Sequence, residues 1–565
     1  MKNQLFLILA ALLLLTQART PFQQTPQFEF IVVRAYYTDR QMIHDLSTWL
    51  EPWEVHPIQN YLVVGVTPLQ YDRLKRAGFR LETDQALTEQ YNRPRVLLPD
   101  QSEGIPGFSC YRTVTETYTT AESMVIAYPD LASWIDIGDS WEKVNQAAGS
   151  DIRVLRLTNS ATPGPKPKLF VMASIHAREY APAELVTRFA EYLLSNYGTN
   201  PDVTWLLDYQ EFHLLLQANP DGRRLAEITQ DQGYMWWRKN TNQDYCTGDS
   251  YNFGADLNRN FEFLWGCCFG SSTYTCDPTY RGQSPGSEPE TQAVQSYLRS
   301  QFPDQRGEGL SDPASENASG VFLDIHSYSE LVLWPWGFTS DEPPNSASLR
   351  TLGKKFAYFN QYEPQQAYDL YVTDGSTDDF AYGDLGLAAY TFEVGNSFFE
   401  PCGQFENTLV PENLPALLYA AKISRLPFLL PAGPDTISIG LDKNGIYSGT
   451  PIQLTAQIDD SRFFNGISPP ILIEPVQDIY SAEFTIDIPP WITTTVPVTY
   501  PLSVIDGAFD EPVEAVVATV DTIGLDRGRH TIYVHGQDTA GNWGAVTAIF
   551  FFVQEDMLFL PWIVR

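Results

Sequence analysis

The sequence predicts an α/β central domain whose mixed, largely parallel sheet is flanked by helices. A small α+β domain precedes it and an all-β sandwich follows it. Between residues 108 and 428, short apolar runs alternate with helical patterns, whereas after residue 434 short alternating runs are broken by Gly, Pro, Asn and Asp. The 565 residues are too many for one core, and the 43% hydrophobic content excludes a disordered or fibrous protein.

Residues 1–18 predict a secretory signal peptide, with a basic start, a short apolar run and small residues near a cleavage point. The run is shorter than the roughly 20 apolar residues that span a bilayer, and no later run is long enough. We therefore expect a secreted, extracellular protein without a transmembrane segment. The net charge of −33 disfavours nucleic acid as a partner, because it repels phosphate backbones.

Residues 25–90 alternate strand-like and helix-like patterns, which predicts the small α+β domain. The polar, turn-rich residues 91–107 predict an exposed linker, and Arg93 and Arg95 are candidate cleavage points within it.

Within residues 108–428, four apolar runs predict buried strands and two longer periodic segments predict helices. The strands are expected at 168–175, 212–217, 321–325 and 387–394, and the helices at 182–197 and 288–299. Alternation of buried strands with helices is typical of a largely parallel sheet.

All six cysteines lie between residues 110 and 402, so we assign them to the central domain. They fit disulfide bonds in an oxidising compartment, and a metal site made of cysteines alone is the less favoured alternative. The spacing leaves the pairing open. The cysteines are Cys110, Cys246, Cys267, Cys268, Cys276 and Cys402.

Residues 434–555 predict the β-sandwich, and residues 556–565 form an apolar tail for which the sequence offers no account. Within the sandwich, residues 530–544 resemble bacterial immunoglobulin-like modules appended to secreted hydrolases. Such a module either contacts a cell surface or matrix or stabilises the domain that precedes it.

Two predicted strands deliver histidines at their carboxyl ends. The run 168–175 leads into His176 and Glu179, and the run 321–325 leads into His326. Open α/β sheets place ligands at the carboxyl ends of their strands, so these three residues predict a site for one Zn²⁺ with a position left for water. The alternative is that each histidine is an ordinary buried polar group.

Glu393 is a lone carboxylate inside the apolar run 387–394. A buried carboxylate is unfavourable unless it is paired or functional. Beside a metal-activated water it would serve as general base, and a structural salt bridge is the alternative.

Seven motifs in chain order resemble those of the zinc metallocarboxypeptidase family of carboxypeptidases A, B and T. They are Ile-His-Ala-Arg-Glu (175–179), Asn-Pro-Asp-Gly (219–222), Trp-Arg-Lys (237–239), Asp-Leu-Asn-Arg-Asn (256–260), Ser-Glu-Pro-Glu (287–290), Asp-Ile-His-Ser-Tyr (324–328) and Thr-Phe-Glu (391–393). The resemblance spans nearly all of residues 108–428. It implies a hydrolase that removes residues from the C-termini of peptides and proteins.

The resemblance also implies a role for each site residue. His176, Glu179 and His326 hold zinc, Glu393 is the general base, and Arg238 stabilises the oxyanion of the tetrahedral intermediate. The substrate is bound by Arg178 and, at its terminal carboxylate, by Asn258, Arg259 and Tyr371, while Asp256 orients His176. The N-terminal domain occupies the place of a propeptide that blocks the cleft, and a permanent accessory domain is the alternative.

Asp378 lies at the family position that floors the side-chain pocket, counted from both Tyr371 and Glu393. An acidic residue there resembles the members that prefer C-terminal Lys or Arg, because a buried carboxylate selects a cation. A turn-capping aspartate is the alternative.

Three other functions compete with this interpretation. The pattern Gly-Gln-Ser-Pro-Gly (282–286) matches a nucleophile elbow around Ser284, but the strand and helix that an elbow needs are not predicted beside it. A catalytically silent peptide-binding or adhesion protein of the same fold would have lost a ligand or Glu393. A cell-wall peptidase would not need Asn258, Arg259 and Tyr371.

Overall fold

An eight-stranded mixed sheet forms the centre of the molecule in this computed structural model, which describes residues 30–93, 95–146, 148–228, 234–249, 251–469 and 471–554. The predicted signal peptide (1–18) and apolar tail (556–565) lie outside the described residues. The strand order is β11-β10-β12-β9-β7-β8-β6-β5. The strands are β5 (Ala132–Asp139), β6 (Asp151–Leu157), β7 (Lys168–Ala173), β8 (Glu211–Leu215), β9 (Val321–His326), β10 (Leu331–Trp334), β11 (Glu363–Gln366) and β12 (Ala388–Glu393).

The four inner strands β12, β9, β7 and β8 run parallel, and antiparallel pairs at both sides make the sheet mixed. Every residue of β9 is buried, as expected for a strand covered on both faces. The carboxyl ends of β7, β9 and β12 therefore meet at one edge. The α/β fold class predicted from the sequence is confirmed.

Helices cover both faces of this sheet. Phe212 and His213 are consecutive in β8 and so face opposite sides: Phe212 contacts Phe189 of α6, whereas His213 Nδ1 lies 2.7 Å from the Tyr297 hydroxyl of α9. The helices of this domain are α4 (Val114–Ala127), α5 (Trp141–Gln146), α6 (Tyr180–Asn196), α7 (Pro201–Tyr209), α8 (Pro220–Ala226), α9 (Pro289–Gln301), α10 (Ser346–Asn360), α11 (Thr377–Leu385), α12 (Cys402–Gln404) and α13 (Val410–Ile423).

The N-terminal region folds into its own antiparallel sheet, of order β2-β3-β1-β4, with three helices. Its elements are β1 (Ile31–Tyr36), α1 (Gln41–Ser47), β2 (Glu54–His56), β3 (Tyr61–Val66), α2 (Pro68–Arg76), β4 (Arg80–Thr83) and α3 (Gln85–Tyr91). Thr67 and Gln70 form a capping box that fixes the start of α2. The alternating patterns predicted most of these elements, but the short β2 and α3 were not foreseen.

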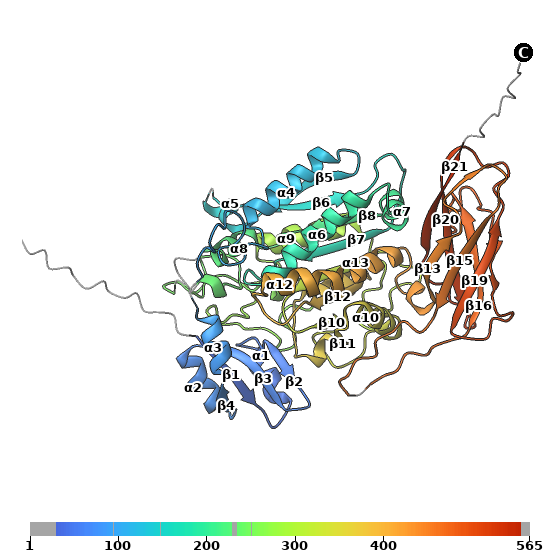
Figure 1. Ribbon diagram of the computed structural model, residues 1–565. Coiled ribbons are helices and arrows are strands. Elements are labelled where there is room, and N and C mark those ends of the chain that lie inside the picture. Colours follow the sequence, from blue (N-terminus) through green and yellow to red (C-terminus); the bar gives the residue numbers. More distant parts are fainter. Residues whose placement is uncertain are drawn as a thin grey trace, which may run out of the picture.

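The C-terminal region has two sheets, of order β13-β15-β19-β18 and β14-β21-β20-β16-β17. Its strands are β13 (Asp435–Leu441), β14 (Gly445–Tyr447), β15 (Ile452–Asp459), β16 (Ile479–Ile486), β17 (Tyr500–Pro501), β18 (Ser503–Val504), β19 (Val513–Val520), β20 (Gly528–Asp538) and β21 (Thr547–Gln554). Trp491 packs against Trp205 of α7, and Lys422 of α13 donates to the Thr547 hydroxyl of β21 at 3.0 Å. The sandwich and the N-terminal domain contact different sides of the central domain (Figure 1).

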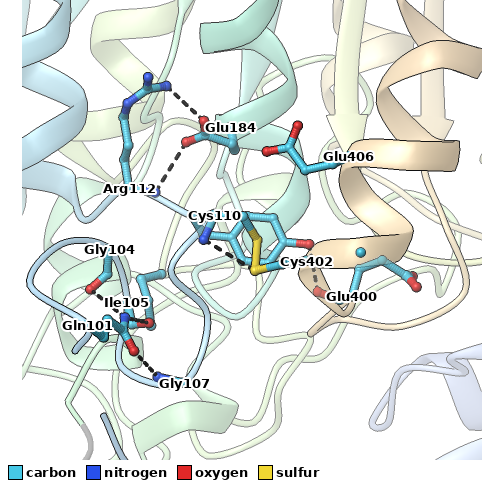
Figure 2. The surroundings of a disulfide bond; sticks show 12 residues. Gln101, Gly104, Ile105, Gly107, Cys110, Arg112, Glu184, Glu400, Cys402 and Glu406 are labelled. Atoms are coloured by element: carbon cyan, nitrogen blue, oxygen red, sulfur yellow. Dashed lines mark hydrogen bonds and ion pairs between the residues drawn. A yellow bond between two sulfur atoms is a disulfide. The ribbon is translucent and has the colours of Figure 1, made fainter. Parts of the chain in front are cut away.

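Three disulfide bonds pair the six cysteines, so the expectation of disulfides in the central domain is confirmed. The bridges are Cys110–Cys402, Cys246–Cys276 and Cys267–Cys268. Figure 2 shows Cys110–Cys402, which joins positions 292 residues apart and ties the start of the domain to the segment before α13. In the part of the chain that the structure describes, no helix is long and apolar enough to cross a bilayer.

Candidate active site

Two histidines and a glutamate meet at the carboxyl edge of the sheet. His176 and Glu179 follow β7, and His326 ends β9, which pairs with β7 in parallel. One ligand atom from each residue lies within 4.8 Å of the others, and all three residues are buried. The structure thus brings together the residues that the sequence proposed as ligands.

The two imidazoles are oriented for a shared ligand. Their Nδ1 atoms lie 3.1 Å apart, and His176 Nδ1 lies 2.8 Å from a carboxylate oxygen of Glu179. On the far side, Asp256 lies 3.1 Å from His176 Nε2 and Asp324 lies 2.9 Å from His326 Nε2. A carboxylate at Nε2 favours the proton there, which leaves both Nδ1 lone pairs pointing to one place. This donor set of two imidazole nitrogens and one carboxylate fits zinc.

The backbone around Glu179 explains why its side chain is free for this site. Glu179 is the N-cap of α6, yet its side chain makes no capping hydrogen bond. Its second carboxylate oxygen instead accepts from the backbone N–H of Ser327 at 3.1 Å. The buried Arg223 donates to the Glu179 carbonyl oxygen at 2.7 Å and so fixes the turn between β7 and α6.

Glu393 lies beside the histidines because β12 pairs in parallel with β9, which sets Glu393 opposite His326. Part of its surface faces a cavity, but the surrounding protein still removes most solvent from the carboxylate. This burial, together with Glu179 and Glu51, raises the pKa of Glu393 to about 8. A carboxylate in such an environment accepts a proton more readily than an exposed one.

Arg238 is held next to this group by Asp256. Its Nε and one terminal nitrogen donate to the same Asp256 oxygen at 3.0 and 2.8 Å. Despite complete burial, Arg238 and His176 hold the pKa of Asp256 well below its ordinary value. Asp256 therefore orients both His176 and the guanidinium.

The N-terminal domain covers this region of the central domain. Glu51, between α1 and β2, forms ion pairs with both Arg178 and Arg238. Trp53 stacks on Trp236 of the central domain with ring centroids 5.5 Å apart and planes within 4°. A cavity of about 350 Å³ remains between the two domains and is lined by Glu51, Arg178 and Arg238.

Asn258, Arg259 and Tyr371 line a smaller cavity of about 40 Å³ that also reaches Glu393. Asn258 and Arg259 belong to the single turn η2 (Leu257–Arg259), and the Asn258 side-chain oxygen accepts from the Thr377 N–H at 2.9 Å. Tyr371 is buried against the core of the N-terminal domain.

Asp378 lines the same small cavity from the first turn of α11. One of its oxygens accepts from the Ser376 hydroxyl at 2.8 Å and from the Asp379 N–H at 3.0 Å. Burial raises the pKa of Asp378, so a cation that enters the cavity would favour the ionised carboxylate.

The structure adds two residues that the sequence analysis missed. Asp324 opens the motif 324–328 but was given no role of its own, although its position two residues before His326 on the same strand could have indicated a shared face. The residues around Glu51 in the sequence do not indicate a functional role for it, because its partners Arg178 and Arg238 lie in another domain. Ser284 itself is exposed in irregular backbone without a preceding strand, so the nucleophile elbow is absent.

Comparison with known proteins agrees with this geometry. The family model described as zinc carboxypeptidase matches residues 117–412. The chain is 31% identical over 348 residues to a zinc carboxypeptidase of Saccharothrix mutabilis subsp. capreolus, covering 59% of this chain and 74% of that protein. It is 29% identical over 353 residues to carboxypeptidase A1 of Rattus norvegicus, covering 60% and 72%.

Two solved structures share the fold. Thrombin activatable fibrinolysis inhibitor matches with a TM-score of 0.53 and 23% identity, covering 70% of this chain and 99% of that one. Carboxypeptidase A from Helicoverpa armigera matches with a TM-score of 0.56 and 21% identity, covering 70% and 98%.

This chain is a metallocarboxypeptidase, a hydrolase built on a mixed α/β sheet with a candidate metal site at its carboxyl edge. It belongs to the zinc carboxypeptidase family.

Proposed function

We propose that this protein is a secreted carboxypeptidase that binds one Zn²⁺ and removes C-terminal residues, preferentially Lys or Arg, from peptides and proteins. The observation that carries the proposal is the convergence of His176, Glu179 and His326, with both Nδ1 atoms facing the Glu179 carboxylate and Glu393 beside them. A bound zinc ion would polarise the scissile carbonyl and lower the pKa of water.

Proton transfer and stabilisation of the oxyanion are assigned to two residues of the chain. Glu393 takes the proton of the attacking water and passes it to the leaving amine, as its position opposite His326 on the neighbouring strand favours. Arg238, fixed by Asp256, donates to the oxyanion that develops on the substrate. Removal of one such donor typically costs about 3–4 kcal/mol of transition-state stabilisation.

Recognition of the chain end is assigned to Arg259, Asn258 and Tyr371, with Arg178 binding the peptide further upstream. A guanidinium binds a carboxylate through two parallel hydrogen bonds, which suits an exopeptidase that must detect a free C-terminus. Asp378 then selects the side chain, because its buried carboxylate is stabilised by a Lys or Arg cation and opposes an acidic or apolar group.

The N-terminal domain is proposed to be an inhibitory propeptide. Its Glu51 engages the two arginines that a peptide would need, and Trp53 covers the same region. Of the two candidate cleavage points, Arg93 is exposed but precedes Pro94, and the Arg95 guanidinium is stacked 3.8 Å from the Phe399 ring centroid. The exposed residues 96–98 between them and the central domain are therefore the accessible part of the linker.

For the C-terminal sandwich, the contacts of Trp491 with α7 and of Thr547 with α13 support a stabilising role. Contact with a cell surface or matrix stays a prediction, which binding of the full chain to whole cells or isolated matrix would test.

Peptides that differ only in their last residue test the proposal. The full chain, activated by limited proteolysis of the linker, is incubated with each peptide and the products are followed by mass. We expect release of a single C-terminal Lys or Arg, loss of the reaction with phenanthroline, and no reaction with the amidated peptide. Internal cleavage, or equal turnover of the amidated peptide, would contradict the exopeptidase assignment.

A further inference from the structure

The Cys267–Cys268 bridge joins neighbouring residues in the loop between η2 and α9. The entropy that a disulfide removes from the unfolded chain grows with the length of the closed loop, so a bridge between neighbours stabilises the whole fold least. The bridge does close an eight-membered ring that includes the peptide bond, and this ring restricts the backbone of both residues. Its effect is therefore local.

Backbone N–H groups in this ring and just after it donate hydrogen bonds to one buried carboxylate. Asp374, which is 0% exposed, accepts from the Cys268 N–H at 3.2 Å and from the Gly270 N–H at 2.9 Å. Its other oxygen accepts from the Ser271 hydroxyl. In the sequence, Asp374 lies between Tyr371 and Asp378, which are two residues of the proposed substrate site. Its hydrogen bonds therefore connect the cysteine loop to the segment that carries both residues.

The same loop also holds the arginine of that site. The Gly270 carbonyl oxygen accepts from Arg259 Nε at 3.1 Å, and the Asn258 carbonyl oxygen accepts from a terminal nitrogen of Arg259 at 2.7 Å. Two backbone carbonyls thus fix the plane of the guanidinium.

The two segments interlock closely enough to move together. A Cβ atom at Gly270 would lie 2.3 Å from the Thr373 carbonyl carbon, and a Cβ atom at Gly375 would lie 2.6 Å from the Arg259 carbonyl oxygen. Gly375 also has a φ of +66°, which favours glycine. A change in the backbone at residues 267–270 is therefore transmitted to both Arg259 and the Tyr371–Asp378 segment.

We infer that the Cys267–Cys268 disulfide is a positioning element for recognition of the substrate's C-terminal carboxylate, acting through Gly270 on Arg259 and through Asp374 on the segment of Tyr371. This inference rests on the proposed function, which assigns the carboxylate to Arg259 and Tyr371. The bridge itself does not contact substrate; it sets the geometry of the groups that do.

The test compares a Cys267→Ser/Cys268→Ser variant with the wild-type full chain, both activated by cleavage of the linker. A well-oriented guanidinium loses binding when it is misplaced by about 1 Å, so we expect KM for a peptide ending in Lys to rise roughly tenfold. We expect kcat to change less than about twofold, because Glu393 and the histidines are untouched. Zinc content and Tm should stay at the wild-type values.

Asp374→Ala supplies an independent test, because it removes both oxygens that accept from Cys268, Gly270 and Ser271. It should raise KM in the same way. If both changes act on one element, the combined variant shows a KM close to that of the worse parent rather than the product of the two effects.

The Cys110→Ser/Cys402→Ser variant is the matched control, because that bridge closes a long segment away from the carboxylate site. It should lower Tm and leave KM unchanged, which is the reverse of the pattern expected for the Cys267→Ser/Cys268→Ser variant. The inference is overturned if the Cys267→Ser/Cys268→Ser variant keeps the wild-type KM while the wild type requires a free C-terminal carboxylate. If the wild type cleaves amidated peptides equally well, the proposed function fails and the inference fails with it.

Discussion

The interdomain contact of Glu51 makes a quantitative prediction about the uncut chain. Glu51 is mostly buried and forms ion pairs with Arg178 and Arg238, whose side chains are 6% and 3% exposed. A Glu51→Gln change keeps the size and the hydrogen-bonding oxygen but removes the charge that both guanidinium groups face. Docking of the N-terminal domain should weaken, and the basal activity of the uncut chain should rise.

The size of the effect on docking depends on the interactions that Arg178 and Arg238 retain in the Glu51→Gln variant. Removal of one partner of a buried pair costs about 3–5 kcal/mol when the other charge is left alone. Here Arg238 keeps Asp256 and Arg178 keeps the Phe398 ring, 4.3 Å from its guanidinium carbon. The loss is then the difference between charged and neutral hydrogen bonds, about 1–2 kcal/mol. That corresponds to about 5- to 30-fold in the docking equilibrium.

The assay compares hydrolysis of a short peptide ending in Lys by uncut and cut chains. The uncut Glu51→Gln variant should be about 5- to 30-fold more active than the uncut wild type, while the two cut enzymes should match. Glu82→Gln is the control, because Glu82 is exposed on the same domain and bonds to Tyr36 rather than to the central domain. An uncut Glu51→Gln chain with wild-type basal activity and unchanged Tm would refute the reasoning.

Three further outcomes are expected. Glu393→Gln should lower kcat by about 10²- to 10⁴-fold with zinc content unchanged by elemental analysis, and undiminished turnover would remove Glu393 as general base. Asp378→Ser should lower kcat/KM for C-terminal Lys by about 10²-fold and raise it for an apolar residue, as measured with paired peptides. His44 Nδ1 accepts from the Val372 N–H at 3.2 Å, which requires a neutral ring, and burial and Arg40 lower its pKa when docked. Its contribution to docking is therefore present above its free pKa of about 6.5 and is lost as pH falls below it. The activity ratio of uncut to cut chain should rise from pH 7 to 5, and His44→Asn should flatten that rise; an equal rise in the variant would exclude His44.

Much of the catalytic centre could be predicted because strand ends are local features of sequence. The apolar runs that end at His176 and His326, and the lone carboxylate in the run of Glu393, indicated three neighbouring strand ends. Parallel pairing of β7, β9 and β12 then brings those ends together, as open α/β sheets generally do. The order of strands within the sheet did not need to be known for this step.

Contacts between distant segments could not be predicted in the same way. Six cysteines allow fifteen pairings, and spacing alone does not select the bridge between the neighbours Cys267 and Cys268. Arg95 was a candidate cleavage point because the linker is polar, yet its guanidinium stacks on Phe399, which is about 300 positions away in the sequence. Sequence composition describes the linker but does not show what covers each side chain.

The assignment of the residues that bind the substrate carboxylate and the inference about the cysteine loop differ in the same way: the first could be predicted from the sequence and the second could not. Arg259 comes from a motif and Tyr371 from the resemblance to the family, whereas the loop that orients them is defined by hydrogen bonds to Asp374 and Gly270 that only the folded chain reveals. A motif specifies which groups bind a carboxylate, and the surrounding backbone specifies how tightly they are held in the productive geometry. A variant of the cysteine pair changes the second property without touching the first, so KM and kcat should separate there, whereas a change of Arg259 itself should affect both.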